Sequence, residues 1–194
     1  MRKNHTLSLP NMLTYARIIA VPLVVLCFFV EGNLQSSDNS RWAALAIFAI
    51  ASITDFFDGY LARIWQQTST IGRMLDPIAD KLLVSACLLL LAADGTIAGW
   101  TLWAAIIILC REVLVSGLRE YLAELKVSVP VSRLAKWKTA AQMVALSFLL
   151  AGPAGEKILP YTTEIGIVLL WISAILTLYT GWDYFRAGLK HVMD

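Results

Sequence analysis

The sequence predicts an all-α integral membrane protein with six transmembrane helices, and its composition is the first reason. The chain has 194 residues, of which 58% are hydrophobic and 15% are charged, and its mean hydropathy is +0.68. Soluble domains average about 45 to 50% apolar and about 25% charged residues. At about 20 residues per span plus short connections, this length accommodates about six helices and no second soluble domain. We therefore expect a single membrane-embedded domain covering residues 1–194.

The second reason is the succession of long apolar segments. They cover residues 11–31, 41–62, 74–93, 97–120, 134–152 and 160–186. Each can cross about 30 Å of hydrocarbon as a helix, which satisfies every backbone hydrogen bond within the segment. The first has no small-residue cleavage pattern at its end, so we expect it to be retained as a span. Turn-forming residues separate the first and second segments at 31–40, the third and fourth at 94–99, and the fifth and sixth at 151–160.

The distribution of Lys and Arg predicts how these helices are oriented. Most of these residues fall at the termini and in the second and fourth connections: Arg2, Lys3, Arg63, Arg73, Arg119, Lys126, Arg133, Lys136, Lys138, Arg186 and Lys190. The remaining connections contain only Arg41 and Lys157. Positively charged loops stay in the cytoplasm. We therefore expect both termini and these two connections on the cytoplasmic side. The net charge of +2 is too balanced to indicate a nucleic-acid-binding protein.

Four aspartates lie at the cytoplasmic ends of the second and third segments. Asp55 and Asp58 are three residues apart, and Asp76 and Asp80 are four apart, so each pair occupies one face of its helix. A charged side chain at the centre of a membrane helix costs about 2.5 to 3.5 kcal/mol, so such residues usually serve ion, proton or substrate chemistry. The connection between the segments is short, which predicts antiparallel neighbouring helices whose acidic faces meet.

Four carboxylates in one pocket need a compensating positive charge. Each close pair repels by about 4 kcal/mol at 4 Å with an effective dielectric constant near 20. Protons or the nearby Arg63, Arg73 and Lys81 could supply the charge, but hard divalent cations match oxygen ligands best. Two such ions would neutralise four carboxylates, and a two-metal cluster is typical of phosphoryl chemistry. The alternative is four carboxylates solvated at the membrane surface.

Read in order, these residues form a recognisable motif. Asp55, Asp58, Gly59, Ala62, Arg63, Gly72, Asp76 and Asp80 spell D-x2-D-G-x2-A-R-x8-G-x3-D-x3-D. This pattern resembles the signature of the CDP-alcohol phosphotransferases, integral membrane enzymes of phospholipid synthesis. Residues 10–14 followed by Arg17 resemble the amino-terminal element of that family. The stretches 111–120 and 136–143 are similar to its bacterial phosphatidylglycerophosphate synthase branch.

The resemblance implies a fold, a reaction and a set of site residues. The fold would be that of the CDP-alcohol phosphotransferases, in a bacterial cytoplasmic membrane. Asp55, Asp58, Asp76 and Asp80 would hold two divalent cations, Mg²⁺ or Mn²⁺, with Asp80 also acting as the general base. The residues that would contact CDP-diacylglycerol are Asn11, Thr14, Gly59, Arg63, Ser69 and Gly72. The acceptor would be sn-glycerol 3-phosphate, the products would be phosphatidylglycerol phosphate and CMP, and the chain would form a homodimer.

The phosphate of such an acceptor requires cations of its own. Arg111 lies within the fourth apolar segment, several residues deeper than Arg119, and an arginine at that depth usually has a function. Glu112 could, however, simply neutralise it. Arg119, Lys136 and Lys138 lie on the same side of the membrane and could complete a phosphate pocket, or could serve as positively charged anchors.

Three other functions are compatible with parts of the sequence. A member of the same family could use inositol, inositol phosphate, serine or phosphatidylglycerol as the acceptor. A membrane prenyltransferase also binds a diphosphate through metals and aspartates, but its aspartates are spaced differently. A cation-coupled transporter would carry carboxylates within its helices too. Transporters usually have internal repeats and broken helices at mid-membrane, and neither is evident in this sequence.

Overall fold

The computed structural model describes the backbone of residues 9–29, 37–65, 70–125 and 133–192. Within these ranges, the side chains of residues 9–11, 55–65, 70–73, 76, 133, 135–136 and 187–192 lie outside the description. The described residues form six α-helices and no strands. The helices are α1 (Leu9–Phe29), α2 (Asp38–Trp65), α3 (Thr70–Ala93), α4 (Thr101–Glu124), α5 (Arg133–Glu156) and α6 (Thr162–Val192). The prediction of an all-α membrane fold is confirmed.

Each helix coincides with one expected apolar segment, and the ends differ by a few residues. The fourth helix begins at Thr101 rather than at residue 97. Gly95 and Gly99 in the preceding loop have φ values of 82° and 56°, which an α-helix does not contain. The last helix continues beyond residue 186 to Val192. Hydropathy places the apolar part of a helix, whereas backbone turns and polar extensions decide where the helix ends.

Three of the described helices are long and apolar enough to cross a membrane by themselves. These stretches are Met12–Phe29, Thr101–Glu124 and Thr162–Arg186. The polar side chains in α2 and α3 lower their hydropathy, and Asp80 and Lys81 of α3 are examples. Six membrane spans therefore stay a prediction for α2, α3 and α5, which pack beside the three apolar helices.

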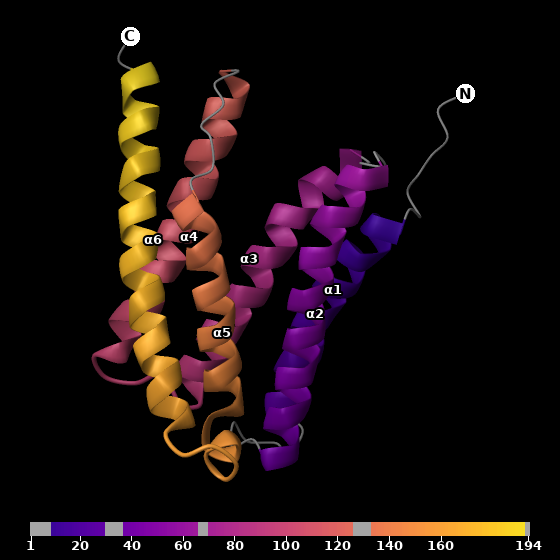
Figure 1. The fold of residues 1–194 in the computed structure, drawn as a ribbon, viewed down its shortest axis with the longest axis vertical. Coiled ribbons are helices and arrows are strands. Elements are labelled where there is room, and N and C mark those ends of the chain that lie inside the picture. Colours follow the sequence, from indigo (N-terminus) through magenta and orange to yellow (C-terminus); the bar gives the residue numbers. More distant parts are fainter. Residues whose placement is uncertain (1–8, 30–36, 66–69, 126–132, 193–194) are drawn as a thin grey trace.

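The helices form two groups with α3 running between them (Figure 1). The first group is α1 with α2, and the second is α4, α5 and α6, in which α5 and α6 have the most extensive contact. The α3 helix packs against α1, α4 and α5. The start of α1 and the ends of α2, α4 and α6 lie at one end of the molecule, at the top of Figure 1. This is the end for which the sequence predicts a cytoplasmic location.

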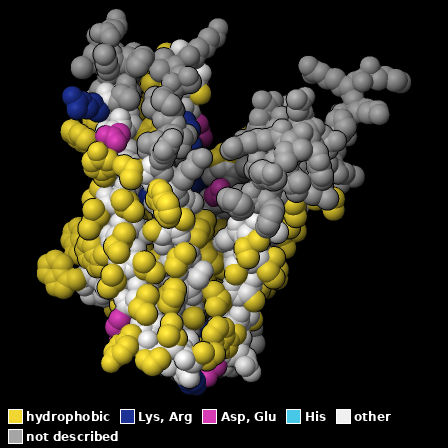
Figure 2. Space-filling model, viewed as in Figure 1, with side chains coloured by type: hydrophobic (Ala, Val, Ile, Leu, Met, Phe, Trp, Pro, Cys, Tyr) yellow, Lys and Arg dark blue, Asp and Glu magenta, His cyan; other side chains and the backbone are white. Residues whose placement is uncertain are grey.

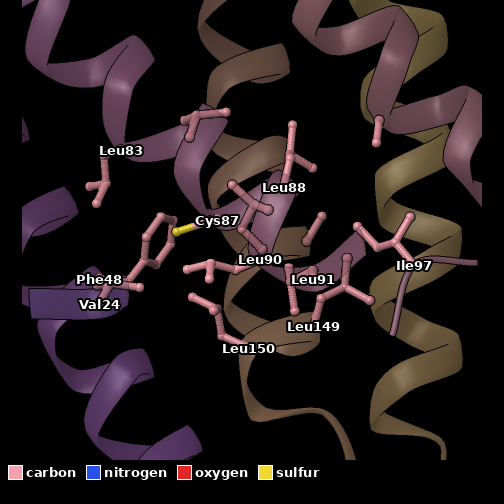
Figure 3. Close-up of a cluster of buried hydrophobic side chains, with 14 of the residues drawn as sticks. Val24, Phe48, Leu83, Cys87, Leu88, Leu90, Leu91, Ile97, Leu149 and Leu150 are labelled. Carbon is pink, nitrogen blue, oxygen red and sulfur yellow. The ribbon is translucent and has the colours of Figure 1, made fainter. Parts of the chain in front are cut away.

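The interior is built around the second half of α3. Cys87, Leu88 and Leu91 of this helix are fully buried, and Phe48 of α2 and Leu149 of α5 pack into the same cluster (Figure 3). In a lipid environment such close packing supplies dispersion contacts rather than a gain from leaving water. Because the cluster joins both groups of helices to α3, it fixes where the polar first half of α3 is presented.

A buried ion pair links α2 to the loop after α3 at the opposite end of the bundle. Arg41 of α2 is buried, and its Nη2 donates hydrogen bonds to Asp94 and, at 3.2 Å, to Thr96 Oγ1. Its guanidinium carbon also lies 5.7 Å from the centre of the Phe28 ring of α1. Gly152 interrupts α5 beside it, with φ 44° and ψ −130°. The predicted turn that begins near residue 151 is thus present, as a break inside α5 followed by one more helical turn.

Candidate active site

The four aspartates occupy matching positions on two connected helices. Asp58 and Asp55 lie seven and ten residues before the end of α2 at Trp65, and Asp76 and Asp80 lie six and ten residues after the start of α3 at Thr70. With a rise of 1.5 Å per residue, the outer and inner pairs lie at about 10 Å and about 15 Å along each helix from the connection. The side chains of Asp55, Asp58 and Asp76 lie outside the described residues. That they meet in one pocket stays a prediction.

Asp80 is the one member of this quartet whose side chain is described. Its Oδ1 accepts a hydrogen bond of 2.9 Å from Nη1 of Arg17, which lies on α1. The Arg17 side chain is 1% exposed, whereas the Asp80 side chain is 39% exposed. A buried guanidinium therefore holds the carboxylate in place from the α1 side and leaves part of it accessible. This ion pair links the amino-terminal element to the aspartate motif.

The residues predicted to contact the nucleotide are described only in part. Thr14 is buried on α1, one helical turn before Arg17 and hence on the same face. The side chains of the others lie outside the described residues: Asn11, Gly59, Arg63, Ser69 and Gly72. Thr14 therefore lies on the α1 face that carries Arg17, the residue bound to Asp80.

Lys81 points in a different direction from its neighbour in sequence. Its Nζ donates a hydrogen bond of 2.5 Å to Oγ of Ser116, which lies on α4. Successive residues of a helix are rotated by about 100°, so Asp80 can face α1 while Lys81 faces α4. The polar half of α3 consequently contacts both groups of helices through adjacent side chains.

A second charged cluster joins α4, α5 and α6. Glu112 of α4 accepts a hydrogen bond from Nζ of Lys138 of α5 and one of 3.4 Å from Nη1 of Arg111. Arg111 also donates to the Thr177 carbonyl at 3.1 Å and to Thr180 Oγ1 at 3.0 Å, both on α6. The side chains of Arg111, Glu112 and Lys138 are 10%, 18% and 7% exposed. Two cations and one anion leave this cluster with an excess positive charge in a poorly solvated place.

Arg119 extends the positive charge toward the end of α4. Its Nη2 lies 3.4 Å from the hydroxyl of Tyr184 on α6, and its guanidinium carbon lies 5.4 Å from the centre of the same ring. The Tyr184 side chain is buried and Arg119 is exposed. Lys136, the fourth predicted phosphate ligand, has a side chain outside the described residues. Arg111 and Arg119 thus lie about two turns apart on α4, and Lys138 of α5 shares Glu112 with Arg111.

Charged side chains also mark this region on the surface. Figure 2 shows hydrophobic side chains covering the middle of the molecule, with dark blue and magenta side chains toward its two ends, including the place near the upper end where the two groups of helices separate. Among the side chains that are described, no three His, Cys, Asp or Glu residues lie together in a way that would hold a metal ion. The only part of the predicted metal quartet in that set is Asp80.

Sequence reasoning did not anticipate several partners in these clusters. Ser116, Thr177, Thr180 and Tyr184 each bind a charged side chain from another helix or from a distant turn. The available signal was weak, because a single Ser, Thr or Tyr in an apolar helix has no characteristic spacing. Their partners were visible in the sequence as charged residues within apolar segments.

Known proteins resemble this chain over most of its length. Residues 7–179 match the model of the CDP-alcohol phosphatidyltransferase family. A protein of Rickettsia bellii described as a CDP-diacylglycerol–glycerol-3-phosphate 3-phosphatidyltransferase is 48% identical over 184 residues, covering 95% of this chain and 97% of its own. Proteins with the same description from Cereibacter sphaeroides and Shigella flexneri are each 39% identical, and each alignment covers 96% of this chain and 98% of the relative.

Proposed function

This chain belongs to the CDP-alcohol phosphatidyltransferase family, and we propose that it transfers a phosphatidyl group from CDP-diacylglycerol to sn-glycerol 3-phosphate. The 1-hydroxyl oxygen of the acceptor attacks the β-phosphorus of the liponucleotide, and the bond from that phosphorus to CMP breaks. CMP leaves, and phosphatidylglycerol phosphate stays in the bilayer. The observation that carries the proposal is likeness over almost the whole chain to relatives named for this reaction.

The aspartate quartet would hold two divalent cations, Mg²⁺ or Mn²⁺. Carboxylate oxygens are the ligands that these hard cations prefer. The matching depth of Asp55, Asp58, Asp76 and Asp80 on two connected helices suits a shared site. The part of the Asp80 carboxylate that remains exposed can serve as a ligand. When bound, the cations supply positive charge to the diphosphate of the donor.

The chain's own side chains have separate tasks in this reaction. Asp80, positioned by Arg17, would accept the proton of the attacking hydroxyl. Thr14 on the same face of α1, together with Asn11, Gly59, Arg63, Ser69 and Gly72, would contact the nucleotide. Because the start of α1, the end of α2 and the start of α3 lie at one end of the molecule, the lipid tails can remain in hydrocarbon while the headgroup reaches this site.

The second cluster would bind the phosphate of the acceptor. Arg111 and Lys138 share the single carboxylate of Glu112, so an anion of charge near −2 would relieve their excess positive charge. Arg offers the paired donor geometry that phosphate oxygens accept. Arg119 and Lys136 lie nearer the predicted cytoplasmic surface and would attract the soluble acceptor. The site would then face the cytoplasm, in a homodimer within the bacterial inner membrane.

The test supplies each candidate acceptor with CDP-diacylglycerol and Mg²⁺ and measures CMP release by the purified chain. We expect release with glycerol 3-phosphate and little or none with serine, inositol, inositol phosphate or phosphatidylglycerol. Glycerol, which has no phosphate, is the matched comparison and should react at least about a hundredfold less efficiently, since it leaves the buried cations unpaired. Turnover with serine but not with glycerol 3-phosphate would overturn the proposal.

The Asp80→Asn variant is the control for the reaction itself. Asparagine keeps an oxygen that can accept the hydrogen bond from Arg17, but it cannot take up a proton. The variant should fold and bind CDP-diacylglycerol without releasing CMP. Retained turnover would remove Asp80 from the catalytic role while leaving the choice of acceptor intact.

A further inference from the structure

We propose that Lys81, held by Ser116, is an additional ligand for the phosphate of the acceptor. This inference rests on the proposed function, because it assigns a residue to the acceptor side of that reaction. It starts from the direction in which Lys81 points. Asp80 contacts Arg17 of α1, and Lys81 contacts Ser116 of α4 at 2.5 Å. One face of α3 therefore presents Asp80 to α1, and another face presents the positive charge of Lys81 to α4.

The position of Ser116 places the Lys81 ammonium beside the charged cluster of Arg111, Glu112 and Lys138, the acceptor cluster. Glu112 lies four residues before Ser116 and Arg119 three residues after it, so all three share one face of α4. Glu112 is the residue that binds Lys138 and Arg111. The ammonium group consequently lies along the same helix face as the predicted phosphate ligands. It is also the cation next in sequence to Asp80, where the transferred phosphorus would be.

The charge of Lys81 has no counterion among the side chains that the structure describes. Its only hydrogen bond there is to the neutral Ser116 hydroxyl, although the side chain is half-buried. An ammonium has three N–H donors, so two remain for another acceptor. A cation in poorly solvated surroundings is stabilised when an anion approaches it. The phosphate of the acceptor is the anion that the reaction brings to this side of α3.

Other anions could use the same ammonium, and the experiment separates them. If Lys81 bound the diphosphate of CDP-diacylglycerol, it would contribute to binding of that substrate. If it instead paired with the aspartate quartet, it would balance the charge of the metal site. Three quantities distinguish these roles: the KM for glycerol 3-phosphate, the KM for CDP-diacylglycerol, and the Mg²⁺ concentration that gives half-maximal rate. Inhibition by inorganic phosphate, measured against glycerol 3-phosphate, reports the anion subsite without any acceptor chemistry.

We expect Lys81→Met to raise the KM for glycerol 3-phosphate by about tenfold to a hundredfold, the effect of losing one charged hydrogen bond. The inhibition constant of inorganic phosphate should rise in parallel. The KM for CDP-diacylglycerol and the Mg²⁺ requirement should change by less than about twofold. Lys81→Arg keeps the charge and should restore most of the affinity. Ser116→Ala leaves the ammonium unanchored and should raise the same KM by a smaller factor.

Lys157→Met is the matched control, because Lys157 pairs with Asp38 at the opposite end of the molecule. It should leave every one of these constants unchanged. An unchanged KM for glycerol 3-phosphate in both the Lys81→Met and Ser116→Ala variants would overturn the inference. A higher KM for CDP-diacylglycerol or a higher Mg²⁺ requirement without a change for the acceptor would also overturn it.

Two further outcomes keep the result interpretable. If Lys81→Met does not fold, Ser116→Ala alone decides the matter: a raised KM for glycerol 3-phosphate supports the inference and an unchanged KM overturns it, because this variant keeps the charge and removes only its anchor. If the wild-type chain releases no CMP with glycerol 3-phosphate, the proposed function itself fails before any variant is compared. The two failures are therefore distinguishable.

Discussion

Glu112 is the residue on which the acceptor cluster depends. It accepts hydrogen bonds from both Lys138 and Arg111, and these two side chains connect α4 to α5 and to α6. Removing one partner of a buried ion pair costs about 3 to 5 kcal/mol, because the remaining charge stays buried without compensation. A charge at this position therefore affects both the stability of three helices and the affinity for an anion.

Glu112→Gln should lower the melting temperature of the purified protein in detergent. Glycerol 3-phosphate should then stabilise the variant more than it stabilises the wild type, because a bound phosphate replaces the lost negative charge. Glu156→Gln is the control, since Glu156 accepts a hydrogen bond from Thr163 in an exposed position at the other end. A ligand-induced shift no larger than that of the wild type would show that the cluster does not bind the acceptor phosphate.

For single residues, the sequence indicated which charged side chains have a function better than it indicated which residues they bind. Arg111 could be proposed as a phosphate ligand because a charged residue deep in an apolar segment usually has a function, and Lys138 because it was expected on the same side of the membrane. Their common bond to Glu112 depends on how α4 and α5 pack, and residues 112 and 138 have no periodic relation in the sequence. Arg17 and Asp80 are 63 positions apart, so their ion pair could not be predicted from the sequence either, although both residues belong to recognised motifs.

At the scale of single elements, the break in α5 is the feature with the clearest energetic consequence. Gly152 has φ 44°, and a Cβ atom at this position would lie 2.6 Å from Nη1 of Arg41. The Gly-Pro pair allowed the sequence to predict a turn here. It did not predict that the guanidinium of a buried arginine would occupy the space that the missing side chain leaves.

Gly152→Ala should destabilise the protein more than Gly95→Ala does. Gly95 also has a positive φ, of 82°, but a Cβ there would meet nothing within 4 Å. The Gly95 variant therefore measures backbone strain alone, about 1 to 2 kcal/mol. The Gly152 variant adds a collision that displaces Arg41 from Asp94 and Thr96. Thermal unfolding of both variants in detergent tests this order, and equal losses would mean that Arg41 moves aside without cost.

The helices themselves were largely predictable because apolar length is a direct requirement for crossing a bilayer. Their packing was not. A short connection between α2 and α3 predicted two neighbouring helices, and Figure 1 shows α3 diverging from α2 toward α4 and α5 beyond their joined ends. The connection fixes only where the helices meet. The direction of α3 is set by the buried residues of its second half, such as Cys87 and Leu91.

At the scale of the whole molecule, this divergence creates two sides of a site around one helix. The first half of α3 presents Asp80 to α1 and Lys81 to α4, while its second half is packed into the common core. A donor bound on the α1 side and an acceptor bound on the α4 side would meet at the end of the molecule where the two groups of helices separate.

The orientation of the molecule in the membrane provides the last prediction. The end that carries the site should face the cytoplasm, and the end with Arg41 and Lys157 should face outward, because positive residues are concentrated at the first end. Single cysteines at the exposed positions Lys157 and Arg186 can report this after Cys27, Cys87 and Cys110 are replaced. A membrane-impermeant thiol reagent should label Lys157→Cys in intact spheroplasts. It should label Arg186→Cys only after permeabilisation. The opposite pattern would place the site outside the cell, where glycerol 3-phosphate made in the cytoplasm could not reach it, and the proposed reaction would have to be abandoned.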